Sequence, residues 1–166
     1  MKWSQALIEN LFAKASRYQH FPVVIQMEEG DIQINLEVGD LDRLGCMLHK
    51  FEIKKQGEGL GDPDRAGRLK AQGDRITQKV SYLLEPLRVI EWDKSAPFVQ
   101  IRSFPPRGDN DFVEFYELLL EGKGDGTLIT LARYRNVKGE RGLEPRPILL
   151  TREVLERLLD DLFFTE

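Results

Sequence analysis

The side chains that most often carry chemistry are scarce and widely spaced in this chain of 166 residues. Cys46 and His49 stand at a spacing found in zinc sites. A structural zinc ion needs four ligands, however, and the sequence holds one cysteine and two histidines. On a strand, these two positions also point to opposite faces. We therefore expect no metal site, and we expect Cys46 to be a buried thiol.

A glycine-rich stretch at 57–61 follows a predicted strand and precedes a predicted helix, as phosphate-binding loops do. Its spacing matches neither the dinucleotide-binding pattern nor the P-loop pattern. Asp62 stands where a further glycine would be, and no Gly-Lys-Ser/Thr follows. We therefore expect residues 56–64 to form a flexible surface loop inside a single domain that spans residues 1–166.

Catalytic motifs are also absent from the sequence. No serine lies in the G-x-S-x-G context of a nucleophile elbow, and the two histidines are not part of a recognisable triad pattern. Carboxylates are plentiful, but Glu114 and Glu117 would lie on opposite faces of one strand. We therefore predict no catalytic residue and no cofactor. The sequence favours a non-enzymatic protein and does not decide the question.

Arginines alternate with aromatic residues between positions 97 and 147, as they do on the sheet faces of some single-strand nucleic-acid binders. The same region holds eight basic and eight acidic residues, and the whole chain has a formal net charge of −4. Cross-strand ion pairs from arginine to Glu114 or Glu117 explain the arginines without a nucleic acid. Nucleic-acid binding is therefore disfavoured. The arginines are Arg102, Arg107, Arg133, Arg135, Arg141 and Arg146.

The elements that must position these residues follow from hydrophobic periodicity and turn signals. The order α-β-β-β-α-β-β-β-β-α predicts an α+β domain, with a largely antiparallel meander sheet of about seven strands and N-terminal, middle and C-terminal helices. The middle helix is predicted over Arg65–Lys79, but a strand that begins near Ile76 competes with it. Thr151 is predicted to cap the last helix, Thr151–Phe163.

Three predicted strands, Phe98–Phe104, Phe112–Leu120 and Leu128–Tyr134, carry apolar residues on both faces. Strands that leave one face to water alternate strictly, so either helices of this chain cover both faces or a partner covers one of them. These strands supply the candidate interface or ligand-binding residues. The candidates are Phe98, Arg102, Phe104, Glu114, Tyr116, Arg133 and Tyr134.

The leading hypothesis is a non-enzymatic module that binds a protein partner or associates with itself. The alternative is a small-ligand-binding or hydrolytic α+β enzyme with its site on the sheet face, at Arg102, Glu114, Tyr116 and Arg133. No signal peptide and no membrane-spanning run of apolar residues is present, and a single cysteine excludes an internal disulfide. We therefore expect a cytoplasmic protein without membrane contact.

Overall fold

The computed structural model describes residues 3–57 and 64–163, so most of the loop predicted at 56–64 lies outside the described residues. Within them, three helices and a ten-stranded antiparallel sheet confirm the α+β class and the predicted order of the main elements. The elements are α1 (Trp3–Ala15), β1 (Val23–Glu29), β2 (Ile32–Leu41), β3 (Gly45–Lys55), α2 (Arg65–Lys79), β4 (Leu87–Asp93), β5 (Phe98–Ser103), β6 (Arg107–Gly108), β7 (Phe112–Lys123), β8 (Gly126–Val137), β9 (Glu144–Arg146), β10 (Ile148–Thr151) and α3 (Arg152–Phe163).

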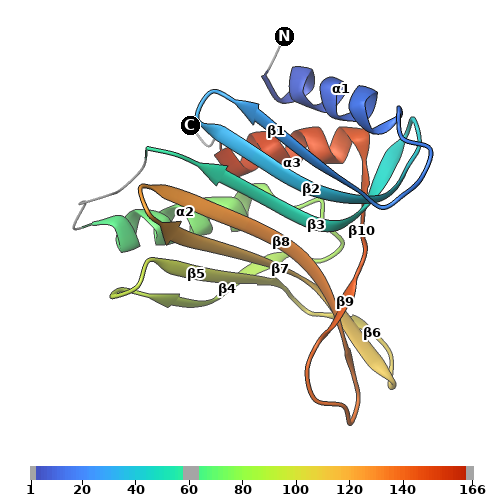
Figure 1. Cartoon of the computed structure of the whole chain (residues 1–166). Coiled ribbons are helices and arrows are strands. Elements are labelled where there is room, and N and C mark those ends of the chain that lie inside the picture. Colours follow the sequence, from blue (N-terminus) through green and yellow to red (C-terminus); the bar gives the residue numbers. More distant parts are fainter. Residues whose placement is uncertain (1–2, 58–63, 164–166) are drawn as a thin grey trace.

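The sheet is one twisted layer with the strand order β1-β2-β3-β8-β7-β5-β4 (Figure 1). Three short strands join it from the side: β10 pairs with β3, β6 with β7, and β9 with β8. They have two to four residues each, too few for a period-two pattern to be visible in the sequence. The structure therefore has more strands than the seven or so that were predicted.

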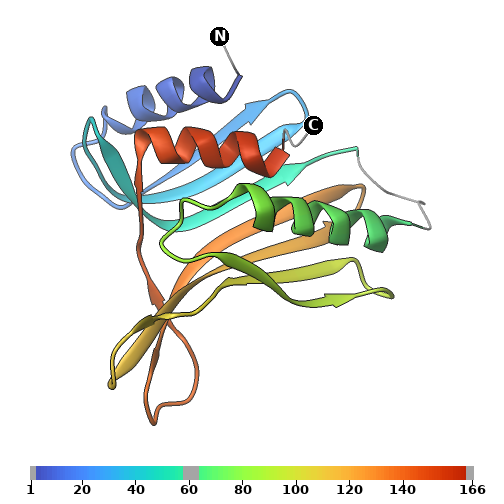
Figure 2. The same cartoon turned by 180° about the vertical axis from the view of Figure 1, so that it is seen from behind.

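The three helices of the described chain lie on the same face of the sheet (Figure 2). Helix α1 packs on β1 and β2, α3 packs on β3 and against α1, and α2 packs on β4, β5 and β7. The leucine stripe of α3 is buried at Leu155, Leu158, Leu159 and Leu162. Thr151 caps this helix as predicted, because its Oγ1 accepts a hydrogen bond from the backbone N–H of Val154 at 3.1 Å.

The middle helix is formed over Arg65–Lys79, so the competing strand near Ile76 is wrong. The buried side of α2 consists of Leu69, Gly73 and Ile76. Gly73 lets the helix approach β5 closely, since a Cβ at this position would lie 2.9 Å from Val99 Cγ1. Gly73 has a low helix propensity, but its lack of a side chain allows the helix to pack closely on the sheet.

The two apolar faces of the central strands have different surroundings. One set is buried in the core beneath the helices and includes Val99, Ile101, Leu118, Leu120, Ile129 and Leu131. The other set, which includes Leu119 and Leu128, is half-buried on the face away from the helices. We call this second face the open face, because no helix of the described residues covers it (Figures 1 and 2).

Candidate functional site

The predicted interface residues separate onto the two faces of the sheet. Cross-strand partners in an antiparallel sheet share a face. Arg133 pairs with Tyr116, and Glu114 pairs with Arg135, next to the core pair Leu118–Leu131. These three predicted residues, Glu114, Tyr116 and Arg133, therefore lie on the helix side. The remaining strand residues lie on the open face, namely Phe98, Arg102 and Tyr134.

On the helix side, Glu114 is surrounded by arginines. Arg135 donates to Glu114 Oε1 from Nη2 at 2.6 Å, and Arg133 donates to Oε2 from its own Nη2 at 3.2 Å. Arg146 Nε lies 3.8 Å from Oε1. The surrounding ends of β7 and β8, with β6 and β9, project beyond the helices (Figures 1 and 2). We call Arg107, Arg133, Arg135 and Arg146, with Glu85 and Glu114, the arginine cluster.

Tyr116 lies beside Arg133 in the arginine cluster. Its ring centroid lies 4.6 Å from the guanidinium carbon of Arg133. The charges of Arg133, Glu85 and Glu114 all affect the pKa of its hydroxyl. Burial raises the pKa of Tyr116, and the positive charge of Arg133 opposes that rise. For Glu114, burial raises the pKa but the hydrogen bonds from Arg135 and Arg133 lower it by more. Glu114 is therefore a carboxylate held ionised by arginines, and Tyr116 is a neutral phenol.

On the open face, Arg102 belongs to a different arrangement. Its Nε donates to Glu117 Oε2 at 2.8 Å, and its guanidinium carbon lies 4.7 Å from the ring centroid of Phe115. Phe115 also contacts Tyr134, with ring centroids 6.1 Å apart. The four residues predicted for a ligand site thus do not all converge, because Arg102 points away from the other three.

Phe104 follows β5 and is 48% exposed. The guanidinium carbon of Arg88 lies 4.7 Å from its ring centroid. Phe98 lies on the open face opposite Glu121 and is half-buried. Neither phenylalanine joins the arginine cluster, and the ion pairs predicted for Glu114 and Glu117 are present on opposite faces of the sheet.

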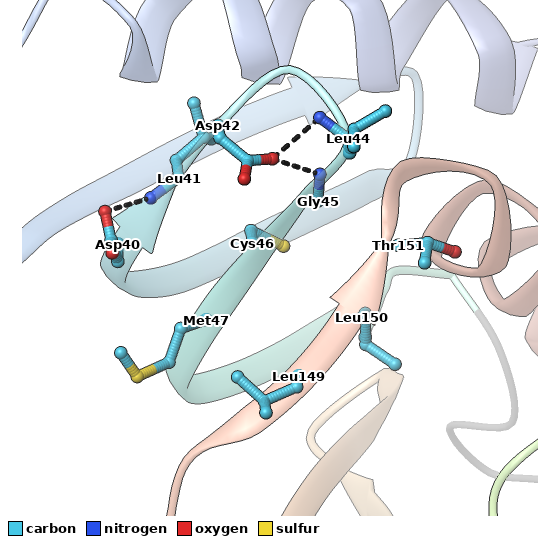
Figure 3. Close-up of a pocket in the computed structure, with 10 residues that line it drawn as sticks. All are labelled: Asp40, Leu41, Asp42, Leu44, Gly45, Cys46, Met47, Leu149, Leu150 and Thr151. Carbon is cyan, nitrogen blue, oxygen red and sulfur yellow. Dashed lines mark hydrogen bonds between the residues drawn. The ribbon is translucent and has the colours of Figure 1, made fainter.

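An apolar pocket of about 390 Å³ lies where β3 pairs with β10 (Figure 3). Met47 and Leu149 are cross-strand partners on the open face, and the turn between β2 and β3 contributes Leu44. Leu44 and Leu149 are 68% and 67% exposed, the highest values among the exposed large apolar residues of the described chain. We call this site the β3–β10 pocket.

The β3–β10 pocket has an acidic rim made by Asp40 and Asp42. Asp42 Oδ1 accepts hydrogen bonds from the backbone N–H groups of Leu44 and Gly45 at 2.7 and 2.9 Å (Figure 3). No ion pair within residues 3–57 and 64–163 involves Asp40 or Asp42. Two carboxylates without a cationic partner therefore stand beside exposed leucines.

Cys46, which also lines this pocket, is buried, as predicted from the sequence. Burial, with a smaller contribution from the charge of Asp42, raises the pKa of its thiol to about 12. Such a thiol is neutral and unreactive at ordinary pH. In the part of the chain that the structure describes, histidines, cysteines and carboxylates do not gather in groups of three that would hold a metal ion.

Comparison of the chain with protein-family models, with curated proteins and with solved structures found no match in any of the three. Function must therefore be inferred from the chain's own residues. Among the described helices, none has the length and apolar character needed to cross a membrane.

Sequence reasoning missed the β3–β10 pocket and one member of the arginine cluster. Leu149 stands between Ile148 and Leu150 in an apolar run, and residue type alone does not distinguish an exposed leucine from a buried one. Glu85 precedes Pro86 in a connection without periodicity. The alternation of β10, with Ile148 and Leu150 buried, is the signal that would have placed Leu149 outside the core.

Proposed function

We propose that this protein is a non-enzymatic binding module that holds a protein partner on its open face, anchored in the β3–β10 pocket. The observation that carries the proposal is the placement of all three described helices on one face, which leaves Leu149, 67% exposed, on the other. Contiguous exposed apolar surface beside polar residues is typical of protein-binding sites. Action in the cytoplasm is part of the same proposal, since the chain's single cysteine makes no internal disulfide.

The chemistry of the pocket specifies the kind of partner. Leu44, Met47 and Leu149 offer an apolar surface, and Asp40 and Asp42 add two negative charges without ion-pair partners in the described chain. The partner segment therefore presents an aliphatic or aromatic side chain next to a lysine or arginine. Charge complementarity of this kind directs the choice of partner more than it raises affinity.

The expected contribution of one anchor follows from its exposure. Leu149 leaves 67% of its surface in water, so a partner that covers it gains about 1–2 kcal/mol of apolar burial, or about 5- to 30-fold in Kd. Leu149→Glu loses this gain and also places a carboxylate in the interface. The fold should tolerate the change, because the side chain already faces solvent.

The test is photo-crosslinking from position 47 in the native cell, with the cross-linked segment identified by mass spectrometry. We expect a segment that combines apolar and basic residues, and we expect Leu44→Glu and Leu149→Glu to abolish the product. Ile90→Glu is the matched control, since Ile90 is a strand aliphatic residue, 49% exposed, in β4 at the far edge of the sheet. Cross-linking that persists unchanged in Leu149→Glu contradicts the proposal.

Light scattering separates a different partner from a second copy of this chain. A monomer in solution, together with a pocket-dependent cross-link to another protein, is the expected result. A dimer that Leu149→Glu converts to monomer would replace the proposed partner with self-association. Asp40→Asn combined with Asp42→Asn should weaken the complex and reduce its salt dependence, because screening acts on the charge pairs that these variants remove.

A further inference from the structure

The sheet formed by the described strands has two edge strands, β1 and β4 (Figure 1). An edge strand has backbone N–H and C=O groups without a strand partner, and proteins commonly protect such an edge with a β-bulge, a lysine or a proline. Strand β4 has a bulge between Val89 and Glu91. Strand β1 pairs with β2 in unbroken register and contains neither lysine nor proline. The side of β1 away from β2, which we call the β1 edge, is therefore the less protected of the two.

The backbone of the β1 edge can accept another strand. A two-residue turn at 30–31 joins β1 to β2, so Glu29 and Ile32 form the hydrogen-bonded pair that closes the hairpin. Along an antiparallel pair, residues whose backbone groups bond to the partner strand alternate with residues whose groups face away. The residues of β1 that face away from β2 are Val24, Gln26 and Glu28.

A groove of about 390 Å³ lies beside the β1 edge, between the end of α1 and the start of β1. Lys14 lies in the last turn of α1, and Arg17 and Tyr18 follow this helix. Residues 24–26 line the groove from β1. Tyr18 is 50% exposed and Val24 is 59% exposed, so both have apolar surface that an added strand would cover.

The groove is positively charged. No ion pair among the described residues involves the side chains of Lys14 or Arg17. In the described part of the chain, no carboxylate lines the groove. The two glutamates of β1 lie at its other end, at positions 28–29, and Glu37 pairs with Val24 on the open face. Charge complementarity therefore favours an acidic occupant beside the end of α1.

We propose that the β1 edge binds an acidic, extended segment of another protein, which joins the sheet as a further strand. The main chain of this segment bonds to the outward backbone groups of β1. Its apolar side chain covers Val24 on the open face, and its acidic side chains face Lys14 and Arg17 on the helix side. In strand addition of this kind, main-chain hydrogen bonds give affinity and alternate side chains give specificity.

The β1 edge is a different surface from the β3–β10 pocket, because no residue lines both. The inference therefore stands independently of the proposed function. The antiparallel direction is the more stable one per residue, and it is the direction of every pairing among the described strands. In this direction the segment begins with a basic residue opposite Glu28 and ends with apolar and acidic residues near Val24 and Lys14.

The probe is a fluorescent, end-capped hexapeptide, Lys-Thr-Thr-Glu-Val-Glu, which in antiparallel register places its lysine opposite Glu28 and its valine opposite Val24. Fluorescence anisotropy with the full chain should show saturable binding. N-methylation of the third and fifth peptide residues removes the amides that face β1, so it should abolish binding. N-methylation of the second and fourth residues, whose amides face away, should leave most of the binding intact.

Variants of the protein test the same surface. Gln26→Pro should abolish peptide binding and keep the fold, because proline on an edge strand can replace a residue whose N–H faces solvent. Lys14→Glu combined with Arg17→Glu should weaken peptide binding about tenfold. Lys79→Glu is the matched control, since Lys79 lies in the last turn of α2 as Lys14 does in α1. Leu149→Glu should also keep full peptide binding, which separates this surface from the β3–β10 pocket.

Three results would overturn the proposal. The first is an absence of binding up to about 1 mM protein. The second is binding that survives N-methylation of the third and fifth peptide residues. The third is a concentration-dependent dimer that Gln26→Pro converts to monomer, because a second copy of the chain would then occupy the β1 edge. If Gln26→Pro fails to fold, the methylated peptides and the variants of Lys14 and Arg17 still decide the question.

Discussion

The packing of α2 on the sheet predicts that replacing glycine with alanine has different effects on stability at two positions of this helix. Gly67 and Gly73 both lie in α2, and each costs helix stability relative to alanine. A Cβ at Gly67 meets no atom within 4 Å, whereas a Cβ at Gly73 lies 2.9 Å from Val99 Cγ1. Gly67→Ala should therefore stabilise the protein, and Gly73→Ala should not.

The magnitudes follow from two competing effects. Helix propensity favours alanine by about 0.5–1 kcal/mol at either position. At position 73 the added methyl meets Val99, a fully buried residue with a stiff branched side chain, and overpacking of this kind costs about 1–3 kcal/mol. Gly67→Ala should raise the free energy of unfolding by about 0.5–1 kcal/mol, and Gly73→Ala should lie about 1–3 kcal/mol below it.

Urea unfolding at constant m value measures both variants, and thermal unfolding gives a second reading of the same difference. Val99→Ala makes room for the new methyl group. A double-mutant cycle between positions 73 and 99 should therefore show a favourable coupling of about 1 kcal/mol or more. If Gly73→Ala stabilises the protein as much as Gly67→Ala does, α2 does not pack on β5 as described. The conclusion that the helices gather on one face would then lose its support.

Three further predictions concern single residues. Burial, assisted by Asp42, raises the thiol pKa of Cys46 from 9.0 to about 12, so its alkylation at about pH 8 should be roughly 1,000-fold slower in folded than in unfolded protein, as thiol titration will show. The pKa of Glu114 is lowered from 4.5, because hydrogen bonds from Arg135 and Arg133 outweigh burial. Its contribution to stability is therefore complete above about pH 4.5 and is lost as the pH falls through the lowered value. Glu114→Gln should accordingly lose less stability than wild type on acidification in urea titrations, and an equal loss would contradict this assignment. Tyr82→Phe removes the 2.7 Å hydrogen bond to Asp161 of α3 and should cost about 1–2 kcal/mol in the free energy of unfolding, whereas no change would show that the bond is absent in solution.

Much of the fold could be predicted because its main elements have periodic sequences. The stripe of α3 repeats at helical spacing, and β2 alternates apolar and polar residues, so the local pattern already specifies the element. The short strands β6 and β9 could not be predicted, because two or three residues show no period. They are ordered by pairing with β7 and β8, the strands that neighbour them along the chain.

The candidate sites were harder to predict than the fold. The pairing of Glu114 with arginines follows from strand neighbours and was expected. Arg102 was wrongly grouped with Arg133, since the side on which a strand residue lies depends on register, and register is set by pairing across the sheet. The exposure of Leu149 likewise depends on tertiary structure, because it is set by the pairing of β10 with β3.

The amino-acid sequence alone was enough to establish an α+β chain, the positions of its three helices, a buried Cys46 and central strands that are apolar on both faces. These properties depend on neighbours within one or two turns or strand periods. Only the tertiary structure decides which face of the sheet the helices cover. The contacts that decide it, such as those of Gly73 with β5 and of α3 with β3, join residues far apart in the sequence. That choice left the β3–β10 pocket exposed on the open face, and the proposed function rests on this pocket.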